Sequence, residues 1–161
     1  MRVLRRAAAV ALIAVALTGC SPVVALQPAE FANNPACAEV IVRLPDRVGD
    51  AAERETDAQA TGAWGDPPSV VLTCGVAVPG PSDLPCILYE GIYWLRDDSD
   101  PERTVFTTYG RDPAVRVAIR AEAFLSDGIA LDGLTNAVSF LPRNGRECLD
   151  TDDTVSGQDL D

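Results

Sequence analysis

Five cysteines and a complete lack of histidine and lysine limit the chemistry open to this chain of 161 residues. Without histidine there is no Ser-His-Asp or Cys-His catalysis and no imidazole ligand for a metal ion. Without lysine there is no Schiff base and no phosphate-binding lysine of the Walker type. Carboxylates remain, because 24 residues are Asp or Glu, and two carboxylates can hydrolyse a glycosidic bond. With so many acids some close pair is inevitable, so this signal has little specificity.

The first cysteine, Cys20, follows a segment with the features of an export signal. Three arginines precede an unbroken apolar run over residues 7–17. The run is too short to cross about 30 Å of hydrocarbon as a helix, and it matches the apolar region of a signal peptide, residues 1–19. The string Leu17-Thr18-Gly19-Cys20 resembles the lipobox of bacterial lipoproteins. This resemblance implies cleavage before Cys20, lipid on its sulfur, and anchoring to the outer face of the cytoplasmic membrane.

The other cysteines form an even set: Cys37, Cys74, Cys86 and Cys148. An even number in an exported chain of this size predicts two disulfides. No pair has Cys-x-x-Cys spacing and no histidine accompanies them, which disfavours a metal site or a catalytic set. Spacing alone leaves all three connectivities open. Each bridge would close a loop of roughly 40–60 residues and contribute about 4 kcal/mol in the chain-entropy model.

The charge balance restricts the partners of the mature chain. Removing residues 1–19 takes three of the 13 basic residues and leaves all 24 acidic ones, for a net charge of −14. Such an acidic surface argues against nucleic acid and against electrostatic docking onto anionic lipid. The acidic string over residues 97–102 lacks the Asp-x-Asp-x-Asp-Gly spacing of a calcium loop. We therefore expect no metal site and no cofactor.

Beyond the signal, the sequence predicts one α+β domain over residues 35–149. Residues 20–34, with the lipidated cysteine, have no clear period and are interpreted as a flexible tether, and residues 150–161, with five aspartates, as an acidic disordered tail. Asn34 and Pro35 are typical of a helix start, and that helix ends at Pro45. A second helix follows from the apolar spacing between Leu131 and Leu141.

The strands expected between these helices alternate or cluster β-branched residues. Residues 46–63 are assigned mainly to loop, with an extended piece near 54–56. The two residues Glu90-Gly91 between two apolar runs predict a tight hairpin. We expect an antiparallel sheet of four to five strands, with both helices on one face. The expected strands are 69–78, 86–89, 92–95, 103–109 and 115–121.

The string Trp64-Gly65-Asp66-Pro67 is the most distinctive local feature. A structural interpretation is that Asp66 caps a turn, Gly65 adopts a positive φ, and Trp64 fills the edge of the core. A functional interpretation makes Trp64 and Trp94 a platform for a glycan or peptide, with Asp66 as a polar anchor. The sequence favours the structural interpretation.

Together with other strings, this motif resembles an actinobacterial family of secreted and lipid-anchored proteins of unknown function. The shared pattern covers roughly residues 35–141. The resemblance implies that Cys37 pairs with Cys74, which leaves Cys86 for Cys148, two cysteines outside the pattern. It implies no activity. The matching strings are Cys37, Leu44-Pro45, Trp64-Gly65-Asp66-Pro67, Cys74-Gly75-Val76, Gly91-Ile92-Tyr93-Trp94 and Phe106-Thr107-Thr108.

These features lead to two functional hypotheses for the folded part. The first is a non-catalytic binding or adaptor module of the cell envelope, anchored through Cys20 and acting on an envelope protein, such as a membrane complex it stabilises, or a cell-wall ligand. The alternative is a carboxylate-dependent hydrolase of cell-wall glycan. A cleft with two carboxyls about 5–9.5 Å apart would favour the hydrolase. A cavity without convergent acids would favour binding.

Overall fold

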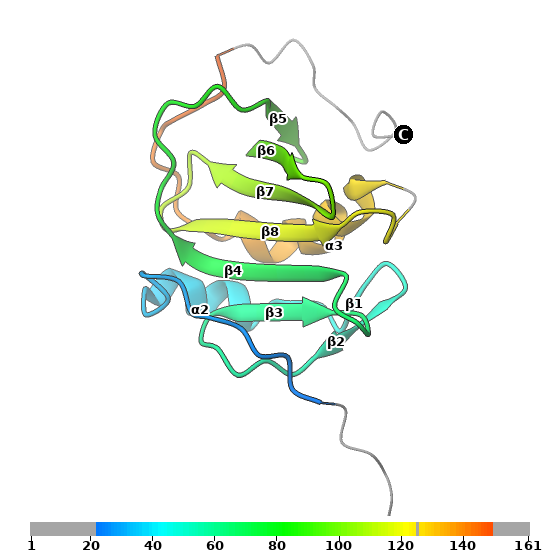
Figure 1. Ribbon diagram of the computed structural model, residues 1–161. Coiled ribbons are helices and arrows are strands. Elements are labelled where there is room, and N and C mark those ends of the chain that lie inside the picture. The colour runs from blue at the N-terminus through cyan, green and yellow to red at the C-terminus, as the bar shows by residue number, and fades with distance from the viewer. Residues whose placement is uncertain (1–21, 125, 150–161) are drawn as a thin grey trace, which may run out of the picture.

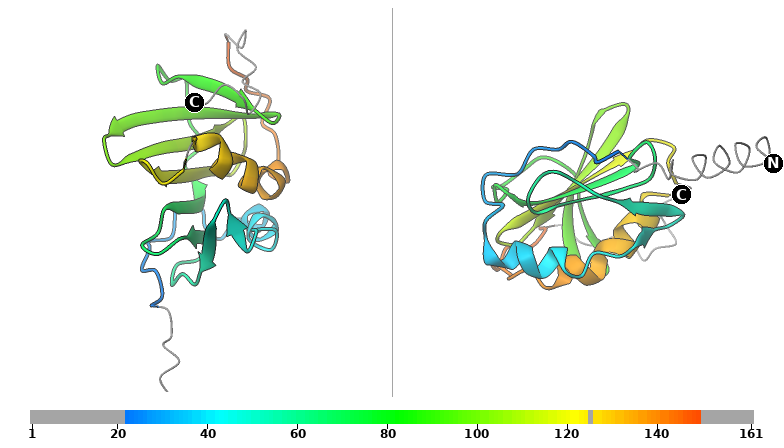
Figure 2. Two further views of the ribbon diagram at one scale, coloured as in Figure 1. Left: turned by 90° about the vertical axis from the view of Figure 1, so that its right-hand side faces the viewer. Right: turned by 90° about the horizontal axis from the view of Figure 1, so that it is seen from below.

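A twisted antiparallel sheet forms the centre of the computed structural model, which describes residues 22–124 and 126–149. Within those residues the sheet has eight strands in the order β1-β2-β3-β4-β8-β7-β6-β5 (Figure 1). Two helices, α2 and α3, both lie on one face of it (Figure 2). The expected signal peptide 1–19, Cys20 and the acidic tail 150–161 lie outside the described residues.

The element bounds follow the local sequence signals closely where those signals are strong. Asn34 caps α2, because its side chain accepts a hydrogen bond from the Ala36 amide at 3.0 Å, and Pro35 takes the first helical position. Tyr89 pairs with Ile92 across the predicted Glu90-Gly91 turn. The helices are α2 Pro35–Ile41 and α3 Asp127–Ser139, and the strands are β1 Arg47–Val48, β2 Ala51–Arg54, β3 Thr61–Trp64, β4 Val70–Val76, β5 Cys86–Tyr89, β6 Ile92–Asp100, β7 Arg103–Tyr109 and β8 Ala114–Arg120.

The single α+β domain with two helices on one face is confirmed, but the expected count of four to five strands is wrong. The additional strands β1, β2 and β3 lie in residues 47–64, a stretch whose sequence (46–63) predicted mainly loop. They are two to four residues long. None of them has the alternating β-branched pattern that marks a strand in a sequence. β3 pairs with β4, β2 with β3 and β1 with β2, so the three strands form by successive pairing and no local signal in the sequence predicts them.

Residues 22–34, assigned to a flexible tether, are held on the domain. Val24 pairs with Thr56 in a parallel bridge, and the Phe31 amide donates to the Gly75 carbonyl at 2.9 Å. Ala32 is only 4% exposed. A Cβ at Gly75 would overlap the Phe31 backbone, so this close approach requires glycine. Backbone hydrogen bonds of this kind produce no periodic pattern in the sequence, so the sequence predicted a flexible tether here. The structure instead holds the chain on the domain from residue 22 onward.

Both disulfides have the predicted pairing. Cys37 and Cys74 join α2 to β4 with a Cα–Cα distance of 5.6 Å, and both are fully buried. Cys86 and Cys148 join the edge strand β5 to the C-terminal segment, with a Cα–Cα distance of 5.9 Å. The first bridge therefore belongs to the core between helix and sheet. The second closes the far edge of the sheet.

Candidate binding groove

The two tryptophans of the expected platform lie in the core. Trp64 and Trp94 are both 0% exposed, and neither offers a ring face to a ligand. They lie on β3 and β6, which are separated by β4, β8 and β7. Four steps of about 4.8 Å between neighbouring strands place the two residues roughly 19 Å apart. The structure thus does not bring the two indoles together.

Asp66, the expected polar anchor, holds a turn between β3 and β4. Its carboxylate pairs with Arg54 Nη1 at 3.0 Å, although the Asp66 side chain is 72% exposed. Arg54 also donates to the Gly65 carbonyl at 3.0 Å and to the Pro22 carbonyl at 2.7 Å. Gly65 has a φ of 91°, as the structural interpretation of this motif requires. The Trp-Gly-Asp-Pro motif therefore fastens strands β2 and β3 to the N-terminal segment.

An opening lies at the end of the sheet away from the Trp-Gly-Asp-Pro motif, between two segments that are far apart in the sequence. Residues 77–85 and 142–149 run side by side along the ends of β6, β7 and β8 (Figure 1). They are joined by the Cys86–Cys148 disulfide and by Arg146 Nη1, which donates to the Pro79 carbonyl at 2.6 Å. Between them lies a cavity of about 380 Å³, which we call the groove.

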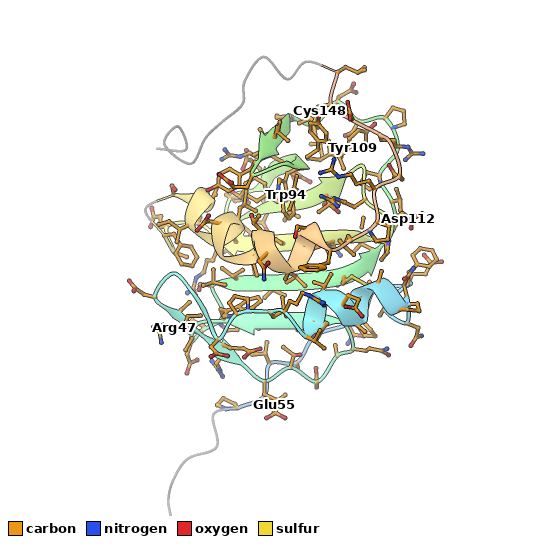
Figure 3. The ribbon with its side chains drawn as sticks, turned by 180° about the vertical axis from the view of Figure 1, so that it is seen from behind. Arg47, Glu55, Trp94, Tyr109, Asp112 and Cys148 are labelled. Carbon is orange, nitrogen blue, oxygen red and sulfur yellow. A yellow bond between two sulfur atoms is a disulfide. The ribbon has the colours of Figure 1, made fainter. Side chains whose placement is uncertain are left out.

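The floor and walls of the groove come from the sheet and from both segments. Leu95 and Tyr109 project from the sheet face that carries no helix, as the alternation along β6 and β7 requires. Tyr109 and Cys148 lie near each other in Figure 3. The mostly apolar remainder of the lining consists of Pro81, Ser82, Leu84, Cys86, Glu147, Cys148 and Leu149.

The C-terminal wall is positioned by backbone contacts to the turn between β7 and β8. The Asn144 amide donates to the Gly110 carbonyl at 2.9 Å, and the Asp112 amide donates to the Pro142 carbonyl at 3.1 Å. Gly110 has a φ of +79°, and a Cβ there would overlap the Arg146 carbonyl oxygen. Only glycine therefore permits residues 142–149 to lie this close to the sheet.

A small cavity of about 40 Å³ adjoins the groove and shares Tyr109 and Glu147 with it. Tyr93, the partner of Tyr109 across β6 and β7, also lines it. Three arginines surround this cavity: Arg111, Arg143 and Arg146. We call it the arginine pocket. In the residues that the structure describes, none of the three forms an ion pair with a carboxylate.

Arg111 is held in place by the end of helix α3. It is 5% exposed, and its Nη1 donates to the carbonyls of Ser139 and Leu141 at 3.1 and 2.5 Å. Carbonyls at a helix C-terminus carry partial negative charge, which stabilises a cation there. Burial, and then the charge of Arg143, lower the pKa of Arg111. The guanidinium of Arg111 is thus held against the end of α3 with a second cation, Arg143, close by.

Glu147 is the single carboxylate residue among the lining residues of the groove and the arginine pocket, as far as residues 22–124 and 126–149 show. A third cavity of about 250 Å³, beside the start of α2, has no charged lining residue. In the same residues no three side chains gather that could hold a metal ion. Nor do they contain a helix that is both long and apolar enough to cross a membrane.

Nothing in the sequence marked Tyr93, Tyr109 or the arginine pocket as parts of a site. These residues come from β6, β7, the turn after β7 and the C-terminal segment, so no spacing in the chain connects them. The one local signal is Gly110 before Arg111, because a glycine at a strand end indicates a turn or a close backbone approach. Arg143 and Arg146 follow a proline that ends a predicted helix, and they resemble an ordinary polar loop.

Comparison with known protein families identifies a family for this chain. The model of the family described as protein of unknown function (DUF3515) matches residues 3–144. The chain belongs to the DUF3515 family. The match covers the Trp-Gly-Asp-Pro motif, the Cys37–Cys74 bridge, Arg111 and Arg143, and it ends before Arg146 and Cys148. No curated protein and no solved structure matches this DUF3515 chain.

Proposed function

We propose that this DUF3515 protein is an actinobacterial lipoprotein, held to the outer face of the cytoplasmic membrane by lipid on Cys20. Its domain is a non-catalytic binding module that takes a component of the cell envelope in the groove. Two disulfides support a location outside the reducing cytosol. The lipobox-like string supports the anchor, and it accounts for the odd cysteine beside two pairs.

The position of the groove in the molecule carries the proposal. The Glu55 carbonyl accepts a hydrogen bond from the Val24 amide, so Glu55 marks where the N-terminal segment meets the domain. Glu55 lies at one end of the molecule, and Tyr109 and Cys148 lie at the other (Figure 3). An anchor two residues before Pro22 therefore keeps the groove away from the membrane surface. There it faces the envelope, where a wall component or a protein partner is accessible.

The lining of the groove favours binding over hydrolysis. Hydrolysis of a glycosidic bond by either standard route uses two carboxyl groups across the bond. Among the described residues the groove and the arginine pocket have Glu147 alone. A groove of about 380 Å³ with tyrosine and leucine side chains has instead the size and character of a binding site.

A photo-crosslinking amino acid in living cells tests the groove. Placed at Ser82 on the groove wall, it should form adducts with an envelope component, and Tyr109→Ala should reduce them severalfold. The matched control position is Glu102, exposed at the turn between β6 and β7. Equal adducts at both positions would contradict the proposal. Release of fragments from purified wall glycan, abolished by Glu147→Gln, would favour the hydrolase.

The anchor has its own test. Cys20→Ser should leave the domain folded but move it from the membrane fraction to the soluble fraction, or leave the signal uncleaved. A variant that loses its signal peptide and still sediments with membranes would contradict lipid anchoring.

A further inference from the structure

We propose that the groove binds a peptide by its free carboxyl end, with the carboxylate in the arginine pocket and the adjoining apolar side chain in the groove. This inference rests on the proposed function and assigns its ligand class. It combines two features that meet at Tyr109: a pocket with unpaired cations and a neighbouring apolar cavity.

The arginine pocket has an excess of positive charge in a chain with a net charge of −11. Three arginines and a single carboxylate residue, Glu147, are among its lining residues, and none of the arginines pairs with a carboxylate within the described part of the chain. Gathering like charges costs free energy unless an anion offsets it. An anion bound from outside the chain would offset the charge that these three arginines bring together at one place.

Arg111 has donors available for that anion. Its Nη1 is used on the carbonyls at the end of α3. Its Nε and Nη2 donate no hydrogen bond to the described residues, and they are not among the buried atoms without a partner. A guanidinium group fits a carboxylate with two parallel hydrogen bonds. Because α3 fixes Arg111, its donors are oriented before the ligand arrives.

The size of the arginine pocket suits a carboxylate. One water needs roughly 10–15 Å³ by a comparable measure. A cavity of about 40 Å³ therefore has room for roughly three heavy atoms, the number in a carboxylate group. A larger anionic polymer would have to leave most of its bulk outside.

The neighbouring groove indicates that the carboxylate belongs to a peptide. Leu84, Leu95 and Tyr109 form an apolar surface next to the cations. The last residue of a peptide offers this combination, because its carboxylate and its side chain are attached to the same Cα. Glu147 lines both cavities, and its carboxylate is the acceptor we assign to the peptide N–H between them.

The test uses the full-length protein purified from membranes in detergent, with acetyl-Ala-Ala-Leu as the probe. The probe with a free carboxyl end should bind at least tenfold more tightly than its C-terminal amide or acetate. Arg143→Gln should weaken its binding at least tenfold, because Arg143 is exposed and its side chain has no described partner. Arg103→Gln, at the other end of β7, is the matched control and should leave affinity unchanged.

Several outcomes would overturn the inference. If acetyl-Ala-Ala-Leu and its C-terminal amide bind equally tightly, the arginines do not bind the carboxylate. If the peptide and acetate bind equally tightly, the pocket is a simple anion site and not a peptide site. Binding seen only in a chain that ends at Leu149 would assign the pocket to the acidic tail of the chain itself. If Arg143→Gln loses its native circular dichroism spectrum, Arg146→Gln takes its place with the same expected result. Failure of the peptide with persistent Ser82 adducts rejects this inference and leaves the proposed function standing.

Discussion

Trp64 and Trp94 are buried to the same extent, but their indole nitrogens differ. Trp64 Nε1 donates to the Pro45 carbonyl at 2.8 Å, which ties β3 to the segment after α2. Trp94 Nε1 is buried and has no partner among the described residues. The Trp94 ring packs edge-on against Phe106, with a centroid distance of 6.4 Å. One indole therefore contributes a hydrogen bond to the core, and the other contributes only packing.

This difference predicts unequal effects of the same substitution. Trp64→Phe should lower the free energy of unfolding more than Trp94→Phe, by about 1–3 kcal/mol, because it leaves the Pro45 carbonyl unpaired. Trp94→Phe removes a donor that has no described partner, which offsets part of the lost packing. Urea denaturation of both variants measures the difference. A Trp94→Phe loss as large as that of Trp64→Phe would contradict it.

Residue-scale features were predictable where the cause is local. The Asn34 cap, the positive φ of Gly65 and the Glu90-Gly91 turn each depend on a few neighbouring residues, and each follows from the sequence. The groove could not be predicted in this way. Tyr109 and Cys148 meet only because the whole sheet and the C-terminal segment are already in place.

At the scale of elements, the disulfides fasten two different parts of the domain. The loops they close differ in length, with sequence separations of 37 and 62 residues. The chain-entropy model gives about 4 kcal/mol for each. Their surroundings differ more than their loops, because Cys37 and Cys74 are fully buried between α2 and β4, whereas Cys86 and Cys148 line the groove.

Replacing each cysteine pair by alanine should separate these contributions. Loss of Cys37–Cys74 should lower the free energy of unfolding more than loss of Cys86–Cys148, despite its shorter loop, because core packing is lost as well. Guanidinium denaturation of both double variants is the measurement. Loss of Cys86–Cys148 should also weaken binding in the groove. A larger loss of stability for this second pair would mean that loop length dominates.

The start of α3 contains a carboxyl with a pH-dependent effect. Burial, the largest cause, and Asp98 raise the pKa of Asp127 above its ordinary value of 3.8, while Arg96 opposes them. Arg96 Nη2 lies 3.6 Å from the carboxylate. The folded state therefore binds a proton at Asp127 more tightly than the unfolded state does. The stability that this preference contributes is complete below pH 3.8, and it is lost as the pH rises through the raised folded value.

Asp127→Asn should remove this pH dependence. Relative to the unchanged protein, the variant should gain stability between pH 3.5 and pH 7, because it does not ionise. Melting temperatures at the two pH values measure the gain, and Asp132→Asn on the exposed face of the same helix is the control. If the difference in melting temperature between Asp127→Asn and the unchanged protein is the same at both pH values, the effects of burial and of Arg96 on the pKa of Asp127 cancel.

Helices and strands were predictable where their own sequence has an apolar period or a turn signal. The hairpin β5–β6, the strands β4, β7 and β8, and both helices have apolar periods or turn residues. The sequence places their bounds within about four residues, except that β6 runs to Asp100 and not only to residue 95. Strands β1, β2 and β3 have no such pattern; β3 pairs with β4, and β2 and β1 then add on to β3 in turn. The N-terminal segment depends on backbone bonds to residues 55–57 and 75.

At the scale of the molecule, the pairing of β4 with β8 separates the two ends of the sheet. Because β8 lies between β4 and β7, the strands β1–β3 stay on one side and β5–β7 on the other. The N-terminal segment binds the first group, and the C-terminal segment closes over the second (Figure 1). This pairing joins strands that are distant in the chain, so local patterns do not reveal it. It determines where a lipid on Cys20 would place the groove.

That arrangement predicts the orientation of the anchored protein. A fluorescent amino acid at Glu55 should be quenched more strongly than one at Ser82 by nitroxide lipids in phosphatidylcholine vesicles carrying the lipidated protein. Both positions are exposed. They lie near opposite ends of the domain, Glu55 beside the N-terminal segment and Ser82 on the groove wall. With Cys20→Ser neither label should be quenched, which separates lipid anchoring from adsorption. Stronger quenching at Ser82 would show that the groove faces the membrane. A lipid would then replace the envelope peptide as the ligand to test.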